Sequence, residues 1–83
     1  MPKFIDFHDS LPALPQEAID QMAAKIKGGK PDAFGVTTHN VFLADGKGWC
    51  YTEGPAASAV CESHRAMGFV QDEGNVSEVK SVV

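Results

Sequence analysis

The sequence predicts a small α+β domain in the order βαββαβ, with a four-stranded antiparallel sheet. Three observations support it: strand-like segments in four places, two segments with apolar residues at helical spacing, and breaks containing Gly or Pro between them. A chain of 83 residues has room for one domain, which we expect to span residues 1–83.

The first half of the chain predicts a strand, a helix and a second strand. Lys3–His8 alternates in character, which is typical of a strand. Pro15 suits the first position of a helix, and Gln16–Lys27 places apolar residues at i, i+3, i+4 and i+7 before a Gly-Gly pair ends the pattern. Phe34–Ala44 is rich in β-branched and aromatic residues and predicts the second strand.

The second half predicts a hairpin partner, a helix and a last strand. The Gly-rich turn Asp45–Gly48 leads into the strand Trp49–Thr52, so the second and third strands form a hairpin. A helix is expected from Pro55 to about Met67, and Asn75–Val83 alternates like a strand. This order is the split βαβ arrangement, which defines a ferredoxin-like fold.

Two short helices can cover only one face of a four-stranded sheet. We expect the other face to carry Phe4, Asp6 and His8 from the first strand, with Trp49 and Tyr51 from the third. So large a bare aromatic surface is unusual on a soluble monomer. The sequence therefore predicts a homodimer in which two sheets pack face to face, a dimeric α/β barrel-like assembly.

Composition excludes several classes of partner. The net charge is −4 and the seven Lys and Arg residues are scattered, which argues against nucleic-acid binding. No run approaches the ~20 apolar residues of a membrane span, and the N-terminus lacks the features of a signal peptide. We therefore expect a cytoplasmic protein, in which Cys50 and Cys61 are free thiols by default, although their number permits one disulfide.

His64 is the most informative candidate for chemistry. The apolar stripe of the second helix, Ala57, Val60 and Cys61, leads to His64, so its imidazole should point toward the sheet or its edge. Two interpretations of His64 are open. It is either a partly buried imidazole that hydrogen-bonds to a backbone carbonyl, or a metal ligand or acid-base group. Cys61 and His64 also have a chelating i, i+3 spacing, although a lone C-x-x-H pair is a weak signal.

Three further candidates lie on the strands. Asp6 and His8 are neighbours on one face, where the carboxylate could fix the imidazole tautomer or form a surface ion pair. Cys50 is either a small buried hydrophobe or, if it faces the helices, a soft ligand beside His64. His39 is expected near the rim of the sheet, as a reserve ligand.

Two segments of the chain resemble a known family. Phe4–His8 reads F-I-D-F-H, and Cys50 opens a segment C-Y-T-E-G-P followed by A-V, His64 and Gly68. These segments resemble a family of small bacterial proteins of largely unknown function, identified as nickel-binding or nickel-responsive. Its pattern is F-x-D-x-H, then C-x-x-E-A-P-S-x-E-A-V-x-x-x-H-x-x-x-G. The spacing from Cys50 to Gly68 is kept without gaps, and Gly54, Ala56 and Ser58 depart from the pattern.

The resemblance implies a ferredoxin-like fold, a dimer, and binding of nickel or another divalent transition metal. By position, it implies the metal-site residues Asp6, His8, Cys50, Glu53 and His64. Mixed nitrogen, oxygen and sulfur ligands suit late first-row metals, although ligand type alone does not select nickel over zinc or copper.

The preferred prediction is a non-enzymatic metal-binding protein, with two alternatives. The chain has no GxSxG, GxxxxGK[ST] or HExxH motif, which disfavours the corresponding enzyme classes. A small-molecule enzyme or ligand-binding protein would use the sheet-helix cavity, with Asp6 and His8 or else His64 as the acid-base group. Its cavity walls would be Trp49, Tyr51, Phe42 and Met67. The other alternative is an interaction module whose dimer surface is its function.

Overall fold

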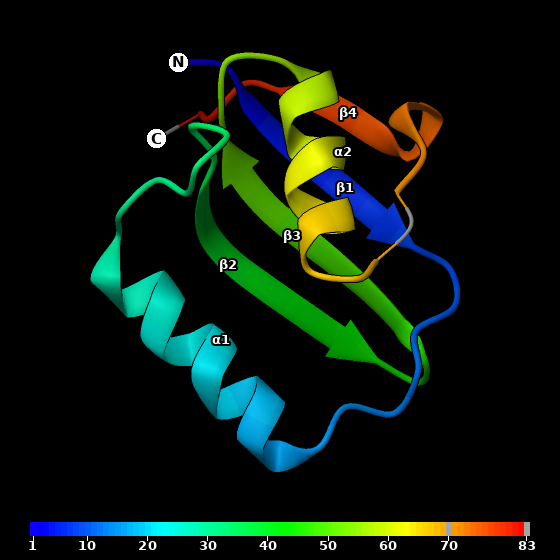
Figure 1. Cartoon of the computed structure of the whole chain (residues 1–83). Coiled ribbons are helices and arrows are strands. Elements are labelled where there is room, and N and C mark those ends of the chain that lie inside the picture. The colour runs from blue at the N-terminus through cyan, green and yellow to red at the C-terminus, as the bar shows by residue number, and fades with distance from the viewer. Residues whose placement is uncertain (70, 83) are drawn as a thin grey trace.

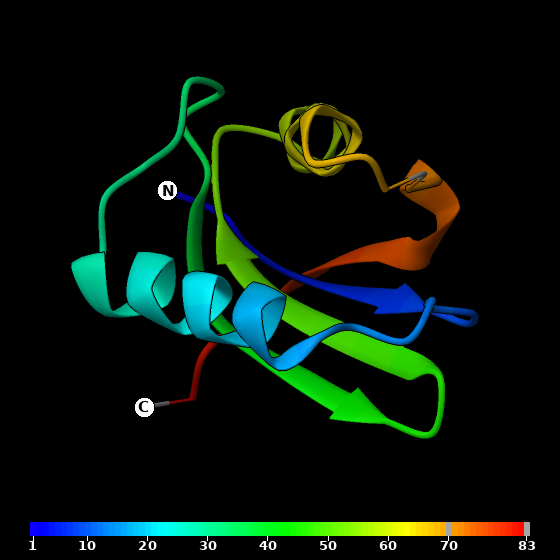
Figure 2. The ribbon, with the colours of Figure 1, turned by 60° about the horizontal axis from the view of Figure 1, so that its bottom comes forward.

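The protein has a ferredoxin-like βαββαβ architecture, seen here in a computed structural model that describes residues 1–69 and 71–82. Four antiparallel strands form one sheet in the order β2-β3-β1-β4. Both helices lie on the same face of this sheet, α1 along β2 and α2 across β1 and β3 (Figures 1 and 2). The predicted α+β fold is confirmed.

Each predicted element is present, with shifted ends. The strands are β1 Lys3–His8, β2 Thr37–Ala44, β3 Lys47–Glu53 and β4 Val76–Val79; the helices are α1 Gln16–Gly28 and α2 Ala57–Ala66; and a 3-10 turn, η1 Glu73–Asn75, precedes β4. The last strand is shorter than predicted because β4 pairs only with β1, whose first residue, Lys3, lies opposite Val79. Val83, the predicted end of that strand, lies outside the described residues.

The hairpin between β2 and β3 is tighter than predicted. Ala44 pairs with Lys47, so the loop contains two residues, Asp45 and Gly46. Both have positive φ, 39° and 75°, which matches a type I′ turn whose twist fits the flanking strands. Lys47 and Gly48, expected in the turn, therefore belong to β3.

One face assignment made from the sequence is wrong. Phe4, Asp6 and His8 are buried beneath the helices. Phe4 packs in the core with Val36 and Val60, which requires it to face α2. A period of two fixes which residues share a face, but it does not say which face the helices cover.

The open face of the sheet carries Ile5 and Phe7 of β1 in their place. Trp49 and Tyr51 do lie there, since the Trp49 ring contacts Phe7 at a centroid distance of 5.4 Å. Phe42, opposite Trp49 in the register, is 54% exposed. A β-bulge between Thr38 and Asn40 places His39 beside Tyr51, with ring centroids 5.3 Å apart.

The buried apolar core is small and lies under α2. Phe4, Val36 and Val60 form its centre, and Ala57, Ala59 and Val76 pack around it. None of the residues of α1, all of which the structure describes, is buried. In the described residues, no helix is both long and apolar enough to cross a membrane.

Candidate metal centre

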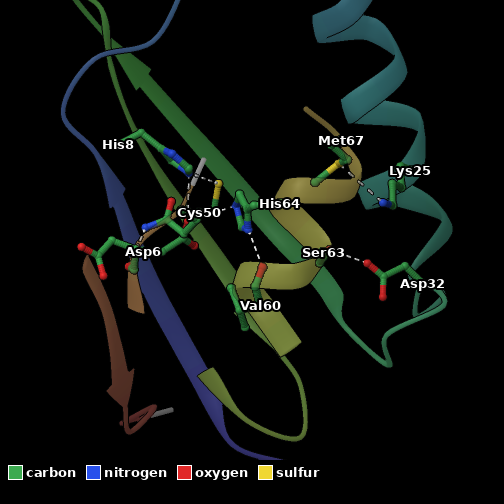
Figure 3. Close-up of polar contacts among 11 residues, drawn as sticks. Asp6, His8, Lys25, Asp32, Cys50, Val60, Ser63, His64 and Met67 are labelled. Atoms are coloured by element: carbon green, nitrogen blue, oxygen red, sulfur yellow. Dashed lines mark hydrogen bonds and ion pairs between the residues drawn. The ribbon is translucent and has the colours of Figure 1, made fainter. Parts of the chain in front are cut away.

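Four chemically active side chains converge between the sheet and α2 (Figure 3). They are Asp6 and His8 of β1, Cys50 of β3 and His64 of α2, and one donor atom from each lies within 4.8 Å of all the others. We call them the donor cluster. It contains two imidazoles, one thiol and one carboxylate, so these side chains form a group able to hold a metal ion.

The strand register explains how the sheet side of the cluster forms. Asp6 and Cys50 are directly paired across β1 and β3, so they share the face that the helices cover. His8 lies two residues beyond Asp6 and therefore on the same face. The three donors from the sheet are thus fixed by backbone pairing, independently of their own contacts.

The helix side of the cluster is fixed by a hydrogen bond within α2. His64 is 4% exposed, as the apolar stripe of the helix predicts. Its Nδ1 lies 2.7 Å from the carbonyl oxygen of Val60, which can only accept, so Nδ1 donates. This bond orients the ring so that Nε2 faces Asp6, the arrangement by which carbonyl groups commonly position metal-binding histidines.

A single carboxylate oxygen lies at the centre of the cluster. Oδ2 of Asp6 is 2.9 Å from Nε2 of His8 and 3.0 Å from Nε2 of His64. Cys50 Sγ lies 3.7 Å from the same nitrogen of His8. Asp6 is fully buried, and neither of its oxygens has a well-directed hydrogen bond to any described residue.

This geometry requires a proton or a metal cation between the rings and the carboxylate. An ionised carboxylate can only accept hydrogen bonds. A neutral His64 that donates through Nδ1 presents a lone pair at Nε2, and that lone pair would repel Asp6. Protons on the imidazoles, or one metal cation shared by them, remove the repulsion.

The pKa values of the cluster favour charged imidazoles and an ionised carboxylate. Contact with Asp6, and then with Cys50, raises the pKa of His8 to about 9, against the effect of burial. Burial alone would lower the pKa of His64, but Asp6, Cys50 and the Val60 carbonyl raise it to about 10. Burial alone would raise the pKa of Asp6, and the two imidazoles outweigh it, so the net shift is downward.

The two cysteines differ in chemistry. Burial raises the pKa of Cys50, but His64 and His8 outweigh it, so the pKa is lowered and the thiolate, the form that binds metals, is favoured. Burial raises the pKa of Cys61, and its thiol lies outside the donor cluster. Both are free thiols. Of the C-x-x-H pair formed by Cys61 and His64, only His64 therefore belongs to the donor cluster.

Glu53 and His39 lie outside the donor cluster. Glu53 is three residues beyond Cys50 on β3, so it points to the opposite face. There its Oε1 lies 2.9 Å from Nε2 of His39, and its Oε2 lies 3.6 Å from the N-terminal amine of Met1. Of the five residues that the resemblance implied, the structure brings Asp6, His8, Cys50 and His64 together and leaves Glu53 on the open face.

A cavity of about 70 Å³ adjoins the donor cluster, and His8, Cys50 and His64 line part of it. Of the cavity walls expected from the sequence, Met67 lines it, whereas Trp49, Tyr51 and Phe42 belong to the open face. Sequence reasoning missed the remaining wall residues, among them Leu11 and Leu14 of the loop before α1. The Leu-Pro pattern of that loop was the available signal.

The fold has a counterpart among solved structures. A crystal structure of a protein from Streptomyces coelicolor A3(2) superposes with a TM-score of 0.69 at 22% sequence identity, covering 98% of this chain and 99% of that chain. At this identity the similarity supports the fold. No protein-family model matches this chain, and no curated protein matches it.

Proposed function

We propose that this protein is a small, non-enzymatic protein that binds a divalent transition metal, nickel, at the donor cluster. The observation that carries the proposal is the convergence of Asp6, His8, Cys50 and His64 on one buried point, with their donor atoms within 4.8 Å of one another. The positive charge that balances Asp6 comes from the protonated imidazoles in the metal-free protein, and a metal ion would replace those protons with one ligand atom from each side chain.

Three contacts among the donors lie close to the ligand spacing of a first-row metal. Metal–nitrogen and metal–sulfur bonds of about 2.0–2.3 Å in a tetrahedral site place ligand atoms about 3.3–3.7 Å apart. The contact of 3.7 Å between Cys50 and His8 lies in this range, and the contacts of 2.9 and 3.0 Å to Asp6 would lengthen by a few tenths of an ångström. Nickel is favoured by the resemblance of the F-x-D-x-H and Cys50–Gly68 segments to the nickel-binding family.

The test is a calorimetric titration of untagged, chelator-treated protein with nickel and with zinc, run beside an absorption titration. We expect nickel to bind with a dissociation constant well below ~1 mM. A thiolate-to-nickel charge-transfer band should appear in the near ultraviolet. Cys50→Ser should abolish this band, whereas Cys61→Ser, which changes a thiol outside the cluster, should retain it.

The histidines provide a second matched pair. His64→Gln should weaken nickel binding at least about tenfold, as expected for loss of a ligand. His39→Gln removes an exposed imidazole on the open face and should leave the affinity unchanged. No nickel or zinc binding tighter than ~1 mM would contradict the proposal. Equal losses in the two histidine variants would contradict the assigned site.

A second candidate function is a small-molecule enzyme. The observation that favours it is the cavity beside His8, Cys50 and His64, because an apolar pocket with a few converging polar groups is typical of a substrate site. His64 paired with Asp6 would then serve as the acid-base group. A metal-loaded protein whose cavity binds organic molecules without changing them would argue against this candidate.

We also propose a homodimer and a cytoplasmic location. The open face carries Ile5, Phe7, Phe42, Trp49 and Tyr51, an aromatic surface that a second copy of the chain would cover. The free thiols of Cys50 and Cys61 are suited to a reducing compartment.

A further inference from the structure

The cavity beside the donor cluster has apolar walls and a polar inner end. Its large apolar side chains come from four segments and include Leu14 of the loop before α1, Met22 and Ile26 of α1, Val41 of β2, and Met67 beyond α2. His8 and His64, which also line the cavity, are buried, whereas Lys25 of α1 is exposed. The imidazoles therefore lie at the inner end and Lys25 at the mouth.

Two features of the fold shape the space between α1 and the sheet. The apolar side of α1 faces the cavity through Met22 and Ile26, yet none of the described residues of this helix is fully buried. Gly48 lies opposite His8, and a Cβ there would lie 2.6 Å from Cδ1 of Leu11. The glycine thus leaves room for Leu11 to form one wall. Space remains beneath α1 that the chain itself does not fill.

The charge at the mouth of the cavity is opposite in sign to the net charge of the chain. The protein has 11 acidic and seven basic residues, but the described residues that line the cavity include Lys25 and no Asp or Glu. The Lys25 amine reaches Met67 Sδ at 4.0 Å, a weak acceptor (Figure 3). Asp32, whose pKa Lys25 helps to lower, already accepts hydrogen bonds from Ser63 and from the N–H groups of Phe34 and Val36.

We propose that this cavity binds a small apolar monocarboxylic acid, with its tail against Leu14, Met22 and Val41 and its carboxylate at Lys25. The carboxylate stays at the exposed mouth because Asp6 already balances the charge of His8 and His64, so another buried anion would be costly, whereas the tail gains from leaving water. A cavity of about 150 Å³ holds a benzene ring, so a volume of about 70 Å³ limits the enclosed part of the tail to a few carbon atoms.

The test is a titration with hexanoate, followed by amide chemical shifts in ¹⁵N-labelled protein. Hexan-1-ol and hexylamine serve as neutral and cationic controls with the same tail. We expect hexanoate to shift the signals of Leu14, Met22 and Val41 with a dissociation constant of about 1 mM or lower, and both controls to bind more weakly.

Two surface variants test the position of the carboxylate. Lys25→Met keeps the shape of the stem and should weaken hexanoate binding about three- to fivefold, the effect of losing one exposed ion pair. Lys27→Met removes the same charge from an exposed position on the same helix, outside the cavity, and should leave binding unchanged. Because both residues are exposed, neither variant should disturb folding.

Four results would overturn the inference: no shifts at the cavity residues, hexan-1-ol binding as tightly as hexanoate, tighter binding of hexylamine, or equal losses in the two lysine variants. The inference is also overturned if dilution without hexanoate shifts the cavity signals, since a second copy of the chain would then fill the space.

The inference goes beyond metal binding and does not require it. Hexanoate binding by chelator-treated protein that fails to bind nickel would support it and overturn the metal proposal alone.

Discussion

Nε2 of His64 lies 3.0 Å from Oδ2 of Asp6, a contact that joins the inward side of α2 to the centre of β1. Both side chains are buried, and the same carboxylate oxygen also meets His8. One buried anion on β1 therefore links this strand to α2 through the charge that its partners carry. The first three predictions concern the strength and charge of this link.

Asp6→Asn should strongly destabilise the metal-free protein. The substitution removes the anion that compensates two buried imidazoles, and removing one partner of a buried ion pair costs about 3–5 kcal/mol. Urea unfolding of chelator-treated protein measures the change. Asp9→Asn, at an exposed neighbour, should shift the free energy of unfolding by no more than about 0.5 kcal/mol. A loss below about 1 kcal/mol for Asp6→Asn would show that the pair contributes little.

The stability of the metal-free protein should fall as the pH rises above 6.5. The pKa values of His8 and His64 rise from 6.5 to about 9 and about 10 on folding. The two imidazoles therefore contribute their full share to the free energy of unfolding below pH 6.5, and this share is lost as the pH rises from 6.5 to about 10. The lowered pKa of Asp6 gives a contribution that is present above pH 3.8 and is lost as the pH falls further. These groups therefore favour folding most between pH 3.8 and 6.5.

Urea titrations from pH 5 to 10 measure this dependence in a Cys50→Ser background, where Asp6, the larger cause of the raised imidazole pKa values, is still present. The lowered pKa of Cys50 adds stability as the pH approaches 9.0 and would partly offset the loss. In that background the free energy of unfolding should decrease steadily above pH 6.5, and less steeply when His8→Gln is added. A constant or rising free energy between pH 6.5 and 9 would contradict the assigned imidazole charges.

Nickel affinity should increase with pH. The raised pKa values of His8 and His64 keep both imidazoles protonated near neutrality, so nickel must displace their protons. Affinity should rise about tenfold per pH unit for each proton released, between pH 7 and 9. Calorimetry in buffers of different ionisation enthalpy counts these protons directly. Binding that releases no protons would show that the ion is held elsewhere.

Phe42→Glu should shift the proposed dimer toward monomer. Phe42 lies on the open face opposite Trp49, and a buried carboxylate without a partner would disfavour sheet-to-sheet packing. Sedimentation velocity at several concentrations gives the oligomeric state. Phe34→Glu, at another exposed phenylalanine in the loop before β2, is the matched control and should leave the dimer intact. A wild-type protein that is monomeric at all concentrations would remove the proposal.

Element order and the inward direction of His64 could be predicted from sequence because they depend on local periodicity. The face of β1 could not. Alternation groups Phe4 with Asp6 and His8, but only packing against Val36 and Val60 decides that this group lies under the helices. The structure buries Asp6 with Phe4 because His8 and His64 compensate the charge of the carboxylate.

Long-range pairing accounts for the other differences. Cys50 and Asp6 are far apart in sequence, and the register of β1 with β3 makes them neighbours. The bulge at His39 and the two-residue turn at Asp45 and Gly46 depend on hairpin geometry, which composition alone leaves open. Glu53 matched a family motif by position, but its odd spacing from Cys50 already indicated the opposite face.

The most direct test of the account is a crystal structure of nickel-loaded protein with anomalous data collected at the nickel absorption edge. We expect one strong anomalous peak per chain between β1, β3 and α2, bonded to Nε2 of His8, Nε2 of His64 and Sγ of Cys50, with an Asp6 oxygen completing the set. A peak at His39 and Glu53 on the open face, with none at the donor cluster, would contradict it.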